Sequence, residues 1–217
     1  MQPNVDKIYI CHWSKLTQRK QDLHEHLLNK GLKDFLWIEP FDTETWDIPQ
    51  IQKEYPSIFT TTSKALGRLA KFSEISLTLK HCHVIKEIIA NNYNTTLILE
   101  DDAVLSENFS EDFNSYITQL PPDWDIAWVG TCCGLHAPLE QNKNIYRMNG
   151  SRCTHAYIIS LNGAKKILTT LHTADQTPDF LYNRWIEELN LNSFWFEPPL
   201  AVQNTKYETT IQNTPNR

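Results

Sequence analysis

The sequence predicts an α/β fold, in which strands and helices alternate around a buried central sheet. Segments of strand character and of helix character follow one another along the 217 residues, which is the pattern of α/β proteins. Residues 95–99 form an unbroken apolar and β-branched run, typical of a strand that is covered on both faces. The length suffices for one sizeable core and is short for two, so we expect a single domain.

The amino-terminal half is expected to contain two strands, two helices and a long loop. Residues 7–11 and 35–38 are short apolar runs typical of strands, and the segment between them is amphipathic, with Gly31 where a helix C-cap belongs. Residues 40–70 carry three prolines and three consecutive threonines, which favours an irregular, functional loop. Apolar residues then recur at helical spacing over residues 73–90.

The carboxyl-terminal half is expected to alternate between short strands and helices. Ser110 is the predicted N-cap of a helix that Pro121 and Pro122 stop. Pro178 is suited to the first turn of another helix, which continues to Leu189. The remaining expected elements are strands at 125–130, 144–148 and 155–160, a helix at 162–171, and a polar, mobile tail at 208–217.

Three carboxylates, Glu100, Asp101 and Asp102, follow the central apolar run directly. Ligands of α/β sheets bind beyond the carboxyl ends of the strands, which is where these acids emerge. Three close carboxylates repel one another unless a cation lies among them, and oxygen ligands suit Mg²⁺ or Mn²⁺, ions that hold phosphates in turn. The run therefore predicts a metal–nucleotide site; the alternative is a solvated acidic loop.

Composition narrows the classes of partner. The formal net charge of −6 argues against nucleic acid or an anionic membrane surface. No apolar stretch approaches the roughly 20 residues of a transmembrane helix, and residues 1–7 lack the apolar core of a signal peptide. We therefore expect a cytoplasmic protein without a transmembrane segment.

The cysteines indicate a reducing environment. The five cysteines are odd in number and show no CxxC spacing, so we expect reduced thiols. Zinc is the alternative, either at Cys132 and Cys133 with His136 or at residues 81–83, but these spacings match no familiar zinc pattern.

Several separated segments share their order and spacing with one enzyme family. They are Ile98–Ala103 (ILEDDA), Glu74 seven residues before His81, residues 122–130 (PDWDIAWVG), residues 154–166 (THAYIISLNGAKK), Pro178-Asp179, and Pro198-Pro199-Leu200 followed by Gln203. Together, over residues 7–204, they resemble glycosyltransferase family 25, the lipooligosaccharide and procollagen galactosyltransferase-like proteins. One departure lies after the first strand, where His12-Trp13 replaces the usual Asn-Leu, although Arg19 keeps the family's arginine.

The resemblance implies a GT-A type, Rossmann-like catalytic domain over residues 1–207, with a mixed, mostly parallel central sheet flanked by helices. It also implies a UDP-sugar donor and an inverting transfer helped by Mn²⁺ or Mg²⁺. Asp102 is our candidate metal ligand, Glu100 is expected to face the ribose, and Asp101 to support either role. Glu74 and His81 are two helical turns apart, so they are expected to face the donor from one side of a helix.

Two further tasks need side chains: balancing the charge of the phosphates and accepting the proton of the acceptor hydroxyl. Arg19 is the favoured phosphate ligand because arginine offers a fork matched to phosphate oxygens. Asp179 is the predicted catalytic base, which takes the proton of the acceptor hydroxyl. Second choices are Lys64, Arg68 and Lys71 for phosphate, Asp123, Asp125 and His155 for the base, and Gln203 for completing the metal or donor site.

Three functions are therefore weighed. The leading one is transfer of a hexose, galactose or glucose, from UDP to a hydroxyl acceptor on a glycan or protein. The second is a nucleotide-sugar hydrolase, which uses the same acids with water as acceptor. The third is a non-catalytic module that binds a glycan or nucleotide, and the intact run Glu100-Asp101-Asp102 argues against it.

Overall fold

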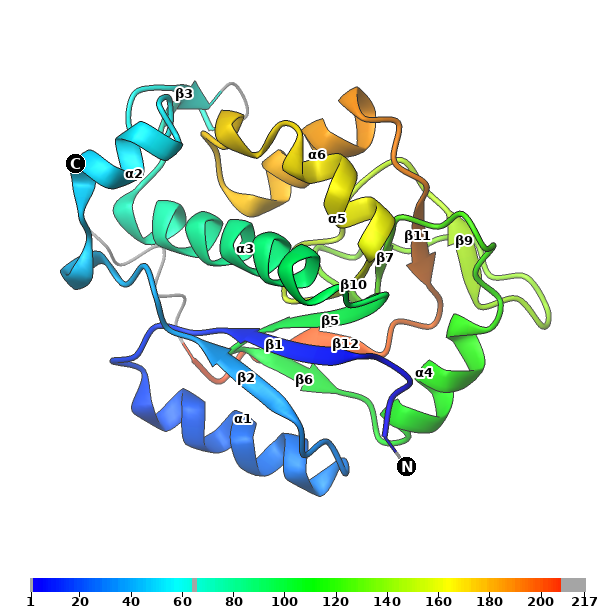
Figure 1. The fold of residues 1–217 in the computed structure, drawn as a ribbon. Helices are drawn as coiled ribbons and strands as arrows, with labels where there is room; N and C mark the ends of the chain where they lie inside the picture. Colours follow the sequence, from blue (N-terminus) through cyan, green and yellow to red (C-terminus); the bar gives the residue numbers. More distant parts are fainter. Residues whose placement is uncertain (1, 64–65, 208–217) are drawn as a thin grey trace.

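The computed structural model describes residues 2–63 and 66–207. Within them, seven strands form the central sheet, and five of the seven run in the same direction while β10 and β9 run opposite (Figure 1). The predicted α/β class, with a mixed, mostly parallel sheet, is confirmed. In spatial order the strands are β2 (Phe35–Ile38), β1 (Lys7–Cys11), β5 (Thr95–Glu100), β10 (Ala156–Ser160), β7 (Ile126–Trp128), β11 (Ser193–Phe196) and β9 (Ile145–Arg147).

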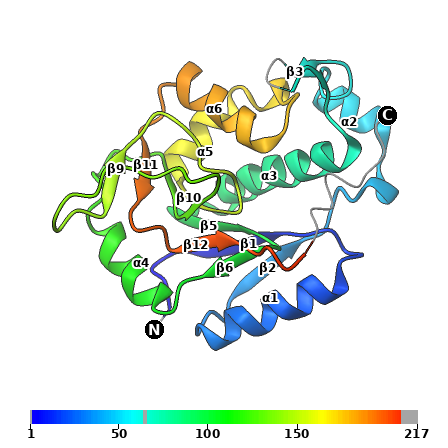
Figure 2. The same ribbon diagram turned by 180° about the vertical axis from the view of Figure 1, so that it is seen from behind.

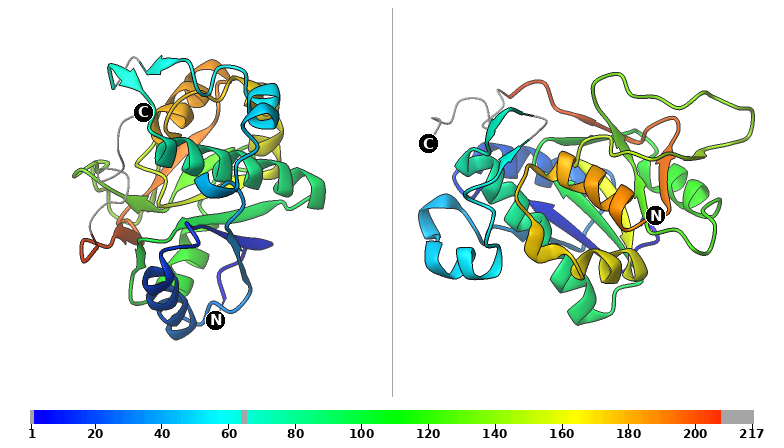
Figure 3. Two further views of the ribbon diagram at one scale, coloured as in Figure 1. Left: turned by 90° about the vertical axis from the view of Figure 1, so that its left-hand side faces the viewer. Right: turned by 90° about the horizontal axis from the view of Figure 1, so that it is seen from above.

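Helices cover both faces of this sheet (Figures 1 and 2). On one face lie α1 (Thr17–Asn29) and α4 (Phe109–Ile117), and on the other α3 (Phe72–Asn91), α5 (Leu161–Leu168) and α6 (Pro178–Glu188). Figure 3 shows the same layers edge-on, with α1 and α3 on opposite sides of the sheet. Two smaller sheets complete the described strands: β6 (Ala103–Leu105), β12 (Ala201–Gln203) and β8 (Gly130–Thr131), and the pair β3 (Thr62–Ser63) and β4 (Arg68–Leu69).

The core explains why residues 95–99 form a strand. Side chains alternate between the faces of a strand, so Ile98 packs in the cluster under α3 while Leu97 and Leu99 pack in the cluster under α1 and α4. All three are fully buried, and burial of each such side chain stabilises the fold by roughly 1.5–3 kcal/mol. The strand is therefore buried from Thr96 to Leu99, and its first charged residue is Glu100 at its carboxyl end.

Several sequence expectations need correction. Residues 40–70 are not an irregular loop, because they contain the 3-10 turn η1 (Thr43–Thr45), helix α2 (Ile48–Glu54) and the β3–β4 pair. Pro49 does not interrupt α2, because it lies in the first turn, where Asp47 accepts the N–H of Gln50. The predicted strand 125–130 is divided into β7 and β8, and the predicted helix 162–171 ends at Leu168, followed by the 3-10 turn η2 (Leu171–Thr173).

The predicted cap at Ser110 is also wrong. Helix α4 begins at Phe109 after Asn108, so Ser110 lies inside the first turn, where it is buried. By contrast, Gly31 adopts the left-handed conformation (φ 81°) directly after the C-cap of α1, as the sequence predicts. The predicted mobile tail, residues 208–217, and Lys64 lie outside the described residues.

The expectation of five reduced cysteines is wrong. Cys132 and Cys153 form a disulfide, while Cys11 and Cys82 are free and buried and Cys133 is free and exposed. The two partners belong to segments on either side of β9, so sequence spacing alone did not indicate the pair. Within the described part of the chain, no helix combines the length and apolar character needed to cross a bilayer.

Replacing Gly163 by alanine is expected to destabilise the fold by about 2–4 kcal/mol. A Cβ at Gly163 would overlap the backbone oxygen of Asp125, which cannot easily move because it accepts the N–H of Ser160 at 2.9 Å. Equilibrium unfolding in urea measures the change. The control is Gly150→Ala, whose Cβ would meet nothing closer than Asn183 Oδ1 at 3.7 Å; equal stability of the two variants would contradict the clash.

Candidate active site

The register of three neighbouring strands assembles the site. In the parallel pair β1–β5, Cys11 lies opposite Glu100, so the next residues, His12 and Asp101, leave the sheet side by side. In the antiparallel pair β10–β5, Ala156 lies opposite Leu99, which brings the residues before Ala156 to the same edge. The carboxyl end of β5 is therefore surrounded by polar side chains from both neighbours, where ligands of α/β sheets bind.

Asp101 is held by two side chains. His12 Nδ1 lies 2.8 Å from Asp101 Oδ2, and Arg19 of α1 donates to Oδ1 at 3.2 Å. His12 is fully buried and packs edge-on against Trp37, and the Arg19 guanidinium lies 5.1 Å from the ring centre of Tyr207. The orientation of the Asp101 carboxylate is thereby fixed from both sides.

Glu100 is the end of a buried hydrogen-bond chain. His81 Nε2 lies 3.2 Å from Glu100 Oε1, and His81 Nδ1 lies 2.8 Å from the hydroxyl of Tyr157, which meets that of Tyr182 at 2.7 Å. Burial by itself lowers the pKa of His81, but Cys11 and the Glu100 carboxylate raise it to about 10. Burial opposes the charge on Glu100 as well, yet His81 and Thr154 keep the pKa of Glu100 below its ordinary value. The pair is therefore ionic at neutral pH.

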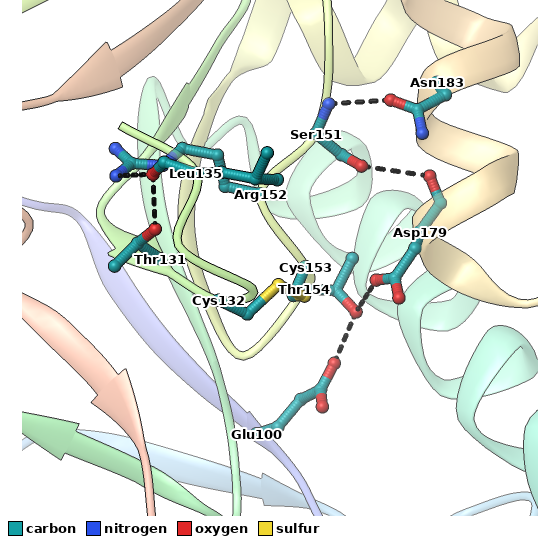
Figure 4. Close-up of a disulfide and its surroundings, with 10 residues drawn as sticks. All are labelled: Glu100, Thr131, Cys132, Leu135, Ser151, Arg152, Cys153, Thr154, Asp179 and Asn183. Atoms are coloured by element: carbon teal, nitrogen blue, oxygen red, sulfur yellow. Dashed lines mark hydrogen bonds between the residues drawn. A yellow bond between two sulfur atoms is a disulfide. The ribbon is translucent and has the colours of Figure 1, made fainter. Parts of the chain in front are cut away.

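Thr154 joins Glu100 to Asp179 (Figure 4). Its hydroxyl lies 2.5 Å from Glu100 Oε1 and 3.2 Å from Asp179 Oδ1. One hydroxyl proton can be donated to only one of the two carboxylates. Burial and then the charge of Glu100 raise the pKa of Asp179 to about 6, so Asp179 exchanges a proton close to neutral pH.

Asp102 is the carboxylate that the protein leaves uncompensated. Its Oδ1 is buried and has no hydrogen-bond partner within residues 2–63 and 66–207. Burial, followed by the charges of Glu100 and Asp101, raises the pKa of Asp102 to about 7, although Arg19 acts in the opposite sense. An orphaned carboxylate oxygen with this affinity for a proton fits a divalent cation.

The acids do not form a ready-made cage for an ion. Among the residues that the structure describes, only Cys132, Cys133 and Cys153 bring three potential ligand atoms of His, Cys, Asp or Glu within 4.8 Å of one another. An ion at Asp102 would therefore take other ligands from water or substrate, as Mg²⁺ does in phosphate sites.

Two pockets meet at Glu100. The first contains the Asp101–Asp102 side of the site and the second contains Asp179, and both are bordered by Leu77, Glu100 and Gln203. The first is lined by Cys11, His12, Trp13, Leu16, Arg19, Thr43, Ser73, Ser76, Leu77, Lys80, Glu100, Asp101, Asp102 and Gln203. The second is lined by Leu66, Glu74, Leu77, Glu100, Cys153, Thr154, Thr177, Pro178, Asp179, Phe180 and Gln203.

Comparison with known proteins identifies the family. The model of glycosyltransferase family 25, described as an LPS biosynthesis protein, matches residues 5–132, which is more than half of the chain. The chain belongs to glycosyltransferase family 25. The match includes the Glu100-Asp101-Asp102 run with β1, α1, α3 and β5, whereas β10, α6 and β12 lie outside it. The chain is thus a homologue of the family 25 glycosyltransferases.

A human relative and two solved structures are similar to this family 25 chain. Human procollagen galactosyltransferase 2 is 27% identical over 154 residues, which are 62% of this chain but only 24% of the human protein. A glycosyltransferase involved in glycosylation of the major capsid of PBCV-1 is 13% identical, with a TM-score of 0.48 over 93% of each chain. A197 from STIV is 8% identical, with a TM-score of 0.44 over 96% of this chain and 97% of that one.

The other predicted site residues of this family 25 chain are partly occupied by contacts within the protein. Glu74 borders the second pocket, but its carboxylate is already held by the fork of Arg68, at 2.8 and 2.7 Å, and by the backbone N–H of Lys71 at 2.6 Å. Of Arg19, Arg68 and Lys71, only Arg19 lines the first pocket, where it also donates to Asp101.

Two of the second choices for the base, Asp125 and Asp123, lie at the opposite end of the strands, whereas His155 directly follows Thr154. Asp125 precedes β7 at the opposite edge of the sheet, where it is fully buried and accepts from Asn162 and Lys166. Asp123 is exposed beside it and accepts from Asn192. His155 is fully buried, and its ring nitrogens have no hydrogen-bond partner among the described residues.

Sequence reasoning missed His12 and Thr154 as parts of the site. Both are polar residues near the ends of the strands that flank β5: His12 follows β1, and Thr154 precedes β10. The signal for His12 was its position directly after the first strand, and the signal for Thr154 was its position directly before the strand segment of the family motif. Neither position says which strand lies beside β5. The contact of His12 with Asp101 and that of Thr154 with Glu100 are therefore known only once the order of strands in the sheet is known.

We expect Asp102 to make the free energy of unfolding depend on pH. In the folded protein the pKa of Asp102 is about 7 and that of Asp179 is about 6, whereas an ordinary aspartate in the unfolded chain has a pKa of 3.8. Between these values the folded protein holds protons that the unfolded chain has released. Their contribution to stability is therefore present below about pH 4 and is lost as pH rises through 6 to 7. In Asp102→Asn, without added metal, the loss between pH 5 and pH 8 should shrink by at least about 1 kcal/mol.

Urea unfolding at several pH values checks this expectation. Asp123→Asn, a change at an exposed carboxylate, is the matched control and should keep the wild-type pH dependence. Parallel curves for the wild type and Asp102→Asn would show that Asp102 does not retain a proton in the folded protein.

Proposed function

We propose that this chain is an inverting, divalent-metal-dependent glycosyltransferase that moves a hexose, galactose or glucose, from UDP to a hydroxyl group of a glycan or protein. The observation that carries the proposal is the pair of pockets that meet at Glu100, with Asp102 in one and Asp179 in the other. A transferase needs two binding pockets that share the reacting atoms, whereas a binding module needs only one.

The first pocket is suited to the donor. Its wall combines apolar side chains, Trp13, Leu16 and Leu77, with Arg19, which supports binding of a base and of phosphate. Asp102 would hold Mn²⁺ or Mg²⁺, which neutralises the charge that develops on the diphosphate as it leaves. Asp101 stays fixed by His12 and Arg19, so the adjacent backbone is oriented before the donor arrives.

The second pocket is suited to the acceptor. Asp179 is half-buried and has a pKa of about 6, which makes it a carboxylate at neutral pH that still accepts a proton readily. We assign to it the proton of the acceptor hydroxyl. Asp179 and Asp102 lie in different pockets that share Glu100, which supports attack by the acceptor from a side other than that of the leaving UDP and hence inversion of the anomeric carbon.

Other residues would set the position of the donor sugar. Glu100 borders both pockets, and we propose that it accepts from a hydroxyl of the donor while His81 and Thr154 keep it ionised and oriented. Gln203 of β12 also borders both pockets and would contact the donor. The name of the human relative supports galactose as the first sugar to test.

We expect Asp102→Asn to remove metal-dependent turnover. UDP release from UDP-galactose and UDP-glucose, measured with Mn²⁺ and with EDTA, should fall at least about 100-fold in this variant, because the metal would lose its protein ligand. The rise in melting temperature that UDP and Mn²⁺ together produce in the wild type should vanish as well. Asp123→Asn should behave as wild type in both assays.

The same assay separates the transferase from a hydrolase. Without acceptor, a transferase is expected to release UDP slowly, whereas release on the order of 10 s⁻¹ would favour a nucleotide-sugar hydrolase. Undiminished metal-dependent release by Asp102→Asn would refute the assignment of the metal ligand.

Asp179→Asn is expected to separate binding from chemistry. Loss of the base should lower UDP release about 10²- to 10⁴-fold, while the affinity for UDP with Mn²⁺ should stay within about a factor of two, since Asp179 does not line the first pocket. Isothermal titration of UDP and a turnover assay measure the two quantities. If affinity and rate fell together, Asp179 would belong to the donor site instead.

A further inference from the structure

Three cysteines gather beside the second pocket, although they come from two distant parts of the chain. Cys132 and Cys153, 21 residues apart, form a disulfide, and Cys133 is a free, exposed cysteine. The sulfur atoms of all three lie within 4.8 Å of one another. A free thiol this close to a disulfide is placed for thiol–disulfide exchange.

The disulfide is joined directly to the site (Figure 4). Cys153 lines the second pocket, and the next residue, Thr154, carries the hydroxyl that bridges Glu100 and Asp179. Two residues earlier, Ser151 donates its hydroxyl to the backbone oxygen of Asp179 at 3.1 Å. A movement of Cys153 is therefore transmitted to the residues that position both carboxylates.

The backbone at the cluster is held in an unfavourable conformation. Cys153 has a φ of 63° and Cys133 a φ of 55°, in the left-handed region that side chains other than glycine and asparagine rarely adopt. Such a conformation persists only where the surroundings impose it, and the bond to Cys132 is one such restraint on Cys153. When that bond opens, Cys153 can return to an extended conformation and carry Thr154 away from the carboxylates.

We propose that Cys132–Cys153 is an exchangeable disulfide, with Cys133 as its exchanging thiol, and that its state controls the position of Thr154 in the site. The effect on turnover rests on the function proposed above, but the exchange and the movement of Thr154 do not. The cluster would make the acceptor side of the enzyme responsive to small thiols and disulfides.

The exchange is balanced within the protein. The Cys133 thiolate attacks the sulfur of Cys153, a bond forms between these two sulfurs, and the bond to Cys132 breaks. Cys132 leaves as a thiolate and takes up the proton that Cys133 had released, so no electrons are gained or lost. Full opening needs a dithiol, which donates two electrons and two protons to the disulfide and becomes a disulfide itself.

The first experiment maps the alternative disulfide in the full chain. Cys132→Ser is incubated with oxidised glutathione, which takes up the two electrons, and is then digested without reduction. A peptide pair linked through Cys133 and Cys153 is expected by mass spectrometry. The matched control, Cys133→Ser, should retain Cys132–Cys153 and show no thiol that reacts with iodoacetamide in the folded protein, because Cys11 and Cys82 are buried. Free, alkylated Cys133 and Cys153 in Cys132→Ser would overturn the proposed exchange.

The second experiment needs no variant and follows the site itself. Hydrogen exchange is measured for the amides of residues 151–155 in wild-type protein with and without dithiothreitol. At least about tenfold faster exchange is expected after reduction, with recovery after oxidised glutathione is added and with no change in residues 95–100, which excludes global unfolding. Unaltered exchange at 151–155 would overturn the link between the disulfide and Thr154. Since neither experiment uses a sugar donor, a failure of the proposed transferase activity is distinguished from a failure of this inference.

Discussion

Mutual repulsion among three consecutive carboxylates at the edge of a buried sheet is the constraint on which the site depends. The protein offsets it with partners from different elements: Arg19 of α1 for Asp101, and His81 of α3 for Glu100. Asp102 receives no such partner from the residues that the structure describes, and its Oδ1 stays buried and unbonded among them. The fold thus neutralises two of the three charges and leaves the third with an affinity for whatever positive charge a ligand brings.

Most of the sheet could be predicted because its strands are apolar over several consecutive residues, as β1 and β5 are. Strands β6 and β12 were not predicted, although β7 and β9, which are also three residues long, lie in predicted strands. β6 and β12 exist because Ala201 and Leu105, far apart in the sequence, pair with each other. The helix cap at Asn108 instead of Ser110 is an error of two residues, within the range over which local signals compete.

The site was predictable to the extent that it lies on strand and helix ends. The three acids and Arg19 line one pocket, and His81, in the middle of α3, contacts Glu100, while Glu74 is held by Arg68. The roles of these residues toward a donor stay predictions. The contact between Thr154 and Glu100 could not be derived, because it depends on β10 lying antiparallel beside β5. The disulfide could not be derived for the same reason. Counting five cysteines favours free thiols, and only the folded chain brings the Cα atoms of Cys132 and Cys153 to 6.1 Å.

Strand β12 links the candidate site to a pairing between distant parts of the chain. It is the last described strand in the sequence, yet it pairs with β6, which follows the three acids almost immediately, and it carries Gln203, which borders both pockets. A pairing between residues about a hundred positions apart forms late, because a long loop must close first. The wall that Gln203 contributes to both pockets can therefore form only after residues 201–203 have been synthesised. This part of the candidate site depends on a pairing between distant segments and not on the local sequence around the acids.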